Sequence, residues 1–153
     1  MAASRIAKLV ELGITLPKLT KPVASYVPFV LDNNGLLWVS GQLPMADGKL
    51  LMTGQVTDES VPDAAAAARQ CAINALAVID EAVGLDRVDR VIKVSGFVKG
   101  AHTFNSPHLV INGCSNLLGE VFGSAHARSA VVVSSLPLDA AVEIEFIVQV
   151  NPQ

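Results

Sequence analysis

The sequence has 153 residues, 51% of them hydrophobic and 16% charged, which suits one domain with a buried core. Its formal net charge is −3 and its Lys and Arg residues are scattered, which argues against a nucleic-acid partner, because such binding depends on neutralising phosphates. The mean hydropathy is high at +0.47, but no apolar run reaches the roughly 18 residues that span a bilayer. We therefore expect a cytoplasmic protein without a membrane partner. We also expect its excess apolar surface to be buried between the subunits of an oligomer.

Residues 1–22 are predicted to form a short helix and an arm, ahead of a single domain at 23–153. The helix is indicated by apolar residues at helical spacing, Ile6, Leu9 and Val10, and Gly13 is placed to end it. The prolines that follow predict an irregular arm across the surface.

A β-hairpin is expected next. Residues 25–31 and 36–42 are β-rich and flank Asn33-Asn34-Gly35, a turn sequence suited to positive φ. Asp47-Gly48 supplies another turn, so we expect residues 49–52 to form a third strand that continues the meander.

A long helix between Ser60 and Gly84 has the clearest pattern. Ser60 can act as its N-cap, Pro62 and Asp63 suit its first turn, and Gly84 follows its last periodic residue. Apolar residues recur at steps of three and four: Ala65, Ala68, Ala72, Leu76, Ile79 and Val83. We expect this stripe to pack on a sheet, with the alanine run allowing close approach of the backbone.

The rest of the chain predicts strand, helix and hairpin. Residues 88–99 read as a strand, with Ile92, Val94, Gly96 and Val98 expected on one face. Ser106-Pro107 predicts the start of a second helix that ends near Gly123. Two further β-rich runs, at 129–135 and 141–150, are separated by a proline-containing turn and are expected to pair as a hairpin.

In the last run apolar and polar residues alternate, which predicts a strand with one buried face and places Glu143 and Glu145 together on the other. The expected order is β-β-β-α-β-α-β-β after the N-terminal helix. This pattern is typical of an α+β domain.

Metal and cofactor signatures are absent from the sequence. His102, His108 and His126 have no metal-ligand spacing, and no Gly-x-Gly-x-x-Gly or Walker loop opens a helix, so we expect neither a metal nor a cofactor. Cys71 and Cys114 each fall in a predicted helix and are expected to be reduced and buried.

Two motifs resemble those of a known family. The string Arg128-Ser129-x-Val131-x-Val133-x-x-Leu136-Pro137-x-x-x-x-Val142-Glu143-Ile144-Glu145 is similar to the C-terminal signature of the Rid family, also called YjgF/YER057c/UK114. Ser40-Gly41-Gln42-Leu43-Pro44 resembles its N-terminal signature. The resemblance covers roughly residues 23 to 150. It implies the chorismate-mutase-like fold, a mostly antiparallel sheet with two helices on one face, assembled as a homotrimer.

The resemblance also implies a site for a small carboxylate-bearing metabolite. In family members that hydrolyse enamines and imines, the residue matching Arg128 binds the substrate carboxylate, and the residue matching Glu143 orients water. Further residues match substrate-binding positions: Ser40, Gly41, Asn112, Ala130 and Tyr26. Ala130 replaces a cysteine of many deaminases, and Tyr26 lies one residue from the register in which a tyrosine is expected. The segment around Asn112 indicates a branch distinct from the best-studied deaminases.

The residues alone leave alternatives open. Arg128 could simply form a surface ion pair with an acid such as Glu143. In a hairpin, however, these residues would lie some 13 Å apart, so either a substrate lies between them or one comes from a neighbouring subunit. Three functions follow: an enamine/imine deaminase acting on metabolites such as 2-aminoacrylate, a non-catalytic metabolite-binding or regulatory trimer, and, least favoured, an endoribonuclease.

Overall fold

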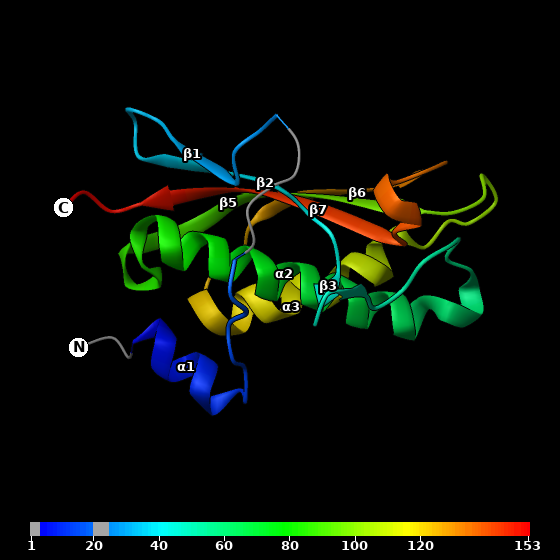
Figure 1. The fold of residues 1–153 in the computed structure, drawn as a ribbon, viewed down its shortest axis with the longest axis horizontal. Helices are drawn as coiled ribbons and strands as arrows, with labels where there is room; N and C mark the ends of the chain where they lie inside the picture. The colour runs from blue at the N-terminus through cyan, green and yellow to red at the C-terminus, as the bar shows by residue number, and fades with distance from the viewer. Residues whose placement is uncertain (1–3, 20–24) are drawn as a thin grey trace.

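A five-stranded sheet with two long helices on one face forms the body of the molecule (Figure 1). The computed structural model describes residues 4–19 and 25–153. The sheet has the strand order β1-β2-β7-β5-β6. Its strands are β1 (Phe29–Leu31), β2 (Leu36–Gln42), β5 (Val88–Lys99), β6 (Ala127–Val133) and β7 (Val142–Val150). All neighbours are antiparallel except β5 and β6, which confirms the expected mostly antiparallel α+β fold.

The helical layer consists of α2 (Val61–Val83) and α3 (Pro107–Phe122), whose limits follow the predicted caps. Gly84 takes a φ of 83° after α2 and Gly123 one of 71° after α3, a region that only glycine enters readily. The predicted stripe of α2 is buried at Ala68, Leu76 and Ile79. Neither helix is long and apolar enough to cross a lipid bilayer, and the same holds for the other helix in the described ranges.

Small residues bring α2 and α3 together. A Cβ atom built on Gly113 of α3 would lie 1.9 Å from the backbone oxygen of Ala65 in α2. Because α3 covers one side of α2 and the sheet another, the buried residues of α2 extend beyond the predicted stripe, to Ala64, Cys71 and Ala75 for example. Close backbone approach at the alanine run is therefore confirmed.

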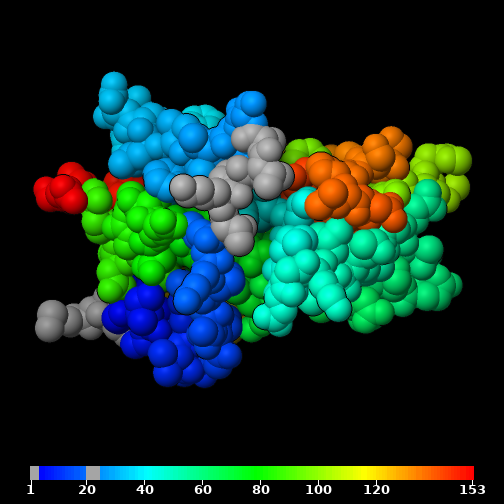
Figure 2. Space-filling view, in the orientation of Figure 1, coloured from blue at the N-terminus to red at the C-terminus, as the bar shows by residue number. Residues whose placement is uncertain are grey.

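The N-terminal helix α1 (Arg5–Glu11) packs on the helical layer, away from the sheet (Figures 1 and 2). Ser4 caps it, and Gly13 follows it with a φ of 72°, as predicted. The backbone N–H of Arg5 donates to Asp86 Oδ1 at 2.7 Å, while Leu9 is 2% exposed. The expected boundary between residues 22 and 23 lies outside the described residues.

Two predicted pairings are wrong. β6 and β7 do not form a hairpin, because β5 lies between them, parallel to β6 and antiparallel to β7. The chain reaches β6 through α3, a crossover that parallel strands require. The third strand does not join the sheet either: β4 (Lys49–Leu50) pairs only with β3 (Met45–Ala46), in a separate ribbon.

Two smaller details differ from expectation. β1 begins at Phe29, so residues 25–28 precede the strand. In β5 the register shifts between Val91 and Lys93, which buries Val91 and leaves Ile92 38% exposed. Val94, Gly96 and Val98 face the helices as predicted. Short 3-10 turns complete the chain at η1 (Asp58–Ser60), η2 (Leu85–Arg87) and η3 (Pro137–Asp139).

The opposite face of the sheet, which we call the open face, carries no helix within the described residues (Figure 1). Several apolar side chains remain exposed there: Val30 at 53%, Trp38 at 46% and Val131 at 43%. Singly such residues are ordinary, but Val30 and Trp38 are partners in the β1–β2 register and so lie side by side, which is typical of a contact surface.

Candidate functional site

Arg128 lies on β6, the edge strand, and its side chain is fixed against α3. Nη1 donates to Ser115 Oγ at 3.0 Å, and Nη2 donates to the backbone oxygen of His108 at 3.1 Å. These two bonds use only part of the guanidinium's fork of N–H donors. The rest can receive a carboxylate in the bidentate manner typical of arginine.

An open groove along α3 exposes this guanidinium. It is lined by Asn112, Ser115, Asn116 and Glu120 from α3, and by His126 and Arg128 from β6 and the segment before it. Asn112 and Arg128, two of the residues chosen from the sequence, therefore lie in the same groove. Most of the lining side chains are hydrogen-bonding groups, which suits a polar ligand.

His126 completes a hydrogen-bonded cluster in the groove. Its Nε2 lies 2.9 Å from Ser115 Oγ, the atom to which Arg128 also donates. Partial burial lowers the pKa of His126, and the positive charge of Arg128 lowers it further. The imidazole is therefore predominantly neutral at pH 7.

Glu143 belongs to a second cluster, on the open face. A Cβ atom on Gly41 would lie 2.7 Å from Glu143 Oε2, so a larger residue at position 41 would displace this carboxylate from its present position. Burial raises the pKa of Glu143, and the nearby Glu145 raises it further. A carboxyl group with a raised pKa can exchange protons nearer neutral pH than an exposed one.

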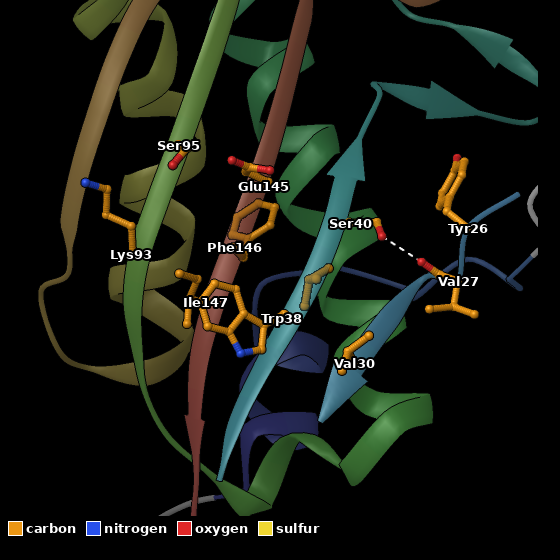
Figure 3. A pocket seen from close by; sticks show the side chains of 11 residues that line it. Tyr26, Val27, Val30, Trp38, Ser40, Lys93, Ser95, Glu145, Phe146 and Ile147 are labelled. Carbon is orange, nitrogen blue, oxygen red and sulfur yellow. Dashed lines mark hydrogen bonds between the residues drawn. The ribbon is translucent and has the colours of Figure 1, made fainter. Parts of the chain in front are cut away.

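Ser40 and Tyr26 border a pocket of about 450 Å³ on the same face (Figure 3). Ser40 Oγ donates to the backbone oxygen of Val27 at 2.6 Å, which holds the segment before β1 against β2. Tyr26 and Val27 both line the pocket. Because these residues precede the strand, the alternation of strand side chains does not apply to them, and the one-residue shift of Tyr26 leaves it at the pocket.

The structure does not bring Arg128 and Glu143 together within one chain. Arg128 shares the helix-covered face with Ala130, which packs on the core, whereas Glu143 alternates with buried residues of β7 and lies on the open face. The register pairs Glu143 with Phe97 of β5, and Phe97 with Val131 of β6. The hairpin geometry behind the 13 Å estimate was therefore wrong, and a direct ion pair does not form.

Ser115 and His126 were missed at the sequence level. His126 lies two residues before Arg128, which puts the two on the same side of an extended chain. Ser115 follows Asn112 by three residues on a helix, which puts these two on the same helix face. Each spacing was therefore a signal that could have found the missed residue. What the sequence lacked was the packing of α3 against β6, which brings the two residues into contact. Among residues 4–19 and 25–153, no three His, Cys, Asp or Glu side chains cluster as metal ligands would.

Comparison with known proteins supports the motif analysis. The model of the Endoribonuclease L-PSP family matches residues 17–150. Protein TCP17 of Trypanosoma cruzi is 42% identical over 157 residues, covering 99% of this chain and 98% of its own length. A 2-iminobutanoate/2-iminopropanoate deaminase of Dermatophagoides farinae is 32% identical over 140 residues, covering 90% of this chain and 95% of its own.

Solved structures agree with the fold. The protein Atu1372 of Agrobacterium tumefaciens, of unknown function, is 46% identical and superposes with a TM-score of 0.87, covering 97% of this chain and 93% of that one. The YjgF gene product of E. coli is 30% identical, with a TM-score of 0.61 over 84% of this chain and 90% of that one. The chain therefore belongs to the Endoribonuclease L-PSP family, the YjgF/YER057c/UK114 or Rid proteins, as its two motifs indicated.

Proposed function

We propose that the chain is a cofactor-free deaminase that hydrolyses small 2-imino acids and their enamine tautomers. The observation that carries this proposal is the Arg128 guanidinium, fixed by Ser115 and His108 with donors left over, beside Asn112 in an open groove. A rigid guanidinium binds a carboxylate with defined geometry. The similarity to a 2-iminobutanoate/2-iminopropanoate deaminase gives the imino acid as the substrate class.

Glu143 is proposed to supply the acid–base chemistry. It would take a proton from water as the oxygen adds to the C=N carbon and pass that proton to the imine nitrogen, which gives a 2-amino-2-hydroxy acid. It would then take the proton of the new hydroxyl group and deliver it to the amino group as the C–N bond breaks, releasing ammonia and a 2-oxo acid. The raised pKa of Glu143 suits both directions of transfer, because a base close to neutral pH can also act as an acid.

The separation of the two clusters supports a site shared between subunits. Arg128 and Asn112 lie at the sheet edge on the helical side, whereas Glu143, Gly41, Ser40 and Tyr26 lie on the open face. A homotrimer in which the β6 edge of one subunit meets the open face of the next would join them. It would also bury the exposed apolar residues of that face, Val30, Trp38 and Val131.

Ammonia release from freshly generated 2-aminoacrylate tests the chemistry. Arg128→Lys keeps the charge but loses the planar fork, so we expect kcat/KM to fall about tenfold or more. Glu143→Gln should leave KM nearly unchanged and lower kcat by about 10² or more, since it removes the acid–base group. The exposed Arg69→Lys and Glu81→Gln serve as matched controls with wild-type rates. Full activity in Arg128→Lys or Glu143→Gln would contradict the assigned roles.

A mixing experiment tests the shared site. Arg128→Ala and Glu143→Gln chains are each expected to be inactive. When they are co-expressed in equal amounts and assemble at random, about a quarter of the sites should combine an intact Arg128 with an intact Glu143. Activity should therefore return. Mixing Arg128→Ala with the double variant is the control and should stay inactive. An inactive first mixture would show that one subunit supplies both residues.

The binding and turnover assays, together with an RNA-cleavage assay, also test two other functions. Tight binding of a small carboxylate to Arg128 without ammonia release would indicate a regulatory, non-catalytic protein. The family description includes endoribonuclease activity, but the net charge of −3 gives no broad attraction for phosphates. RNA cleavage that survives stringent purification and is lost in Arg128→Ala would favour the nuclease.

A further inference from the structure

Three side chains in the α3 groove form a continuous chain of hydrogen bonds. Arg128 Nη1 lies 3.0 Å from Ser115 Oγ, and Ser115 Oγ lies 2.9 Å from His126 Nε2. The three residues come from different places, one from the middle of α3, one from the segment before β6 and one from β6 itself. Their contact therefore depends on how α3 packs against the sheet edge.

The chemistry of the three groups fixes the direction of the first bond and ties the direction of the second to the tautomer of His126. A guanidinium can only donate, so Ser115 Oγ accepts from Arg128. The hydroxyl has one hydrogen to give, and within the described residues the other group in hydrogen-bond contact with Oγ is His126 Nε2. Ser115 can give this hydrogen to His126 Nε2 when the imidazole is neutral and carries its own hydrogen on Nδ1. With the hydrogen on Nε2, the imidazole would instead donate to the second lone pair of Oγ.

We infer that Ser115 and His126 are positioning residues for Arg128: His126 holds the Ser115 hydroxyl so that its lone pair faces the guanidinium, which keeps the fork in place for a carboxylate. This inference deepens the proposed function, because it assumes that Arg128 is the carboxylate anchor. Without the serine the guanidinium would keep only its bond to the backbone oxygen of His108 and could rotate about it.

The contact with Ser115 is the hydrogen bond that orients the ring of His126. Its other ring nitrogen, Nδ1, is buried without a hydrogen-bond partner among the described residues. The charged and titratable neighbours are Arg128, His108 and Glu120, together with Arg90 of β5, which donates to the backbone oxygen of Ala125 at 2.8 Å. The positive charge of Arg128 and the partial burial of the ring disfavour an imidazolium, which could not accept from Ser115.

Nitrogen-15 NMR of the histidine ring tests the direction of the bonds. The neutral histidine side chain in water prefers the hydrogen on Nε2, whereas the inferred chain requires His126 to carry it on Nδ1. The wild-type protein should show the Nδ1–H tautomer at pH 7.5, and Ser115→Ala should shift the ring towards Nε2–H. A wild-type ring with its hydrogen on Nε2 would overturn the inference.

Binding of pyruvate, a 2-oxo acid of the proposed product class, tests the positioning role without needing turnover. We expect Ser115→Ala to raise the pyruvate Kd about tenfold, in line with the loss of one hydrogen bond to a charged group. Ser115→Thr keeps the hydroxyl and should stay within about twofold of wild type. In turnover, Ser115→Ala should raise KM more than it lowers kcat.

The outcomes separate this inference from the proposed function. Unchanged pyruvate affinity in Ser115→Ala, alongside a large loss in Arg128→Ala, would overturn the positioning role and leave Arg128 as anchor. If Arg128→Ala also binds pyruvate normally, the carboxylate anchor is wrong and the positioning role falls with it. If the wild-type protein binds pyruvate and Ser115→Ala weakens that binding, but no ammonia is released from 2-aminoacrylate, the deaminase function is wrong. The positioning role of Ser115 and His126 would then still be supported.

Discussion

Replacing Gly113 by alanine should destabilise the protein, because α2 and α3 cross at this residue without room for a methyl group. A Cβ there would lie 1.9 Å from the Ala65 backbone oxygen and 2.7 Å from its carbonyl carbon. A carbon and an oxygen in contact normally stay about 3.3 Å or more apart. The helices would have to separate by more than about 1 Å, and the obstacle is backbone, which cannot rotate away.

Two effects of opposite sign decide the magnitude. Alanine favours a helix over glycine by about 0.8–1 kcal/mol. Forcing an extra methyl group into a packed interior costs about 1–3 kcal/mol, and the upper end applies when backbone has to move. We therefore expect Gly113→Ala to lower the free energy of unfolding by about 1–2 kcal/mol.

Gly119, on the same helix, provides a matched control. A Cβ on Gly119 would meet no atom within 4 Å, so Gly119→Ala should stabilise the protein by up to about 1 kcal/mol through helix propensity alone. Urea unfolding of both variants at one protein concentration measures the difference, since subunit association would make stability depend on concentration. Equal effects of the two substitutions would refute the close approach of α2 and α3.

Leu76 has no exposed surface, so Leu76→Ala should lower the free energy of unfolding by about 2–5 kcal/mol in urea titrations; no measurable loss would mean that α2 packs through another side. Burial raises the pKa of Cys71 well above its usual value and that of Cys114 to about 12, so neither thiol should react with iodoacetamide at pH 8 until the protein unfolds. Burial and Arg128 lower the pKa of His126. Below about pH 6.5 the unfolded chain therefore binds more protons than the folded one. The free energy of unfolding should fall as the pH drops from about 6.5 through the lowered pKa. His126→Gln should reduce that loss in melting curves at pH 7.5 and 5.5, and an unchanged slope would contradict a buried neutral ring.

Local signals in the sequence predicted those parts of the fold that depend on neighbouring residues. The caps at Ser60 and Gly84 gave the limits of α2, and alternation in β7 gave its buried face, because each rests on chain geometry over a few residues. The pairing of β6 was not predictable in the same way. Adjacent strands in sequence suggest a hairpin, and only the packing of α3 decides that β6 joins β5 in parallel.

The residues of the candidate site likewise include some that the sequence predicts and some that depend on tertiary packing. The family resemblance identified Arg128, Asn112 and Glu143, and the structure puts the first two in one groove. Ser115 and His126 were not predicted as site residues, because no fixed sequence separation indicates which helix residue contacts which residue at a strand edge. The opposite faces of Arg128 and Glu143 likewise follow from sheet order, which no local pattern records.

The position of β7 has a consequence for how the chain reaches its native state. Of the strands in the sheet, β7 comes last in sequence but lies in the middle, between β2 and β5. Until residues 142–150 leave the ribosome, β1 and β2 on one side and β5 and β6 on the other have no strand to join them. Formation of the sheet must therefore wait for residues 142–150, and this long-range pairing predicts slow folding. A nonsense mutation even shortly before Val142 would leave two unconnected pairs of strands with exposed edges, a target for proteolysis and aggregation.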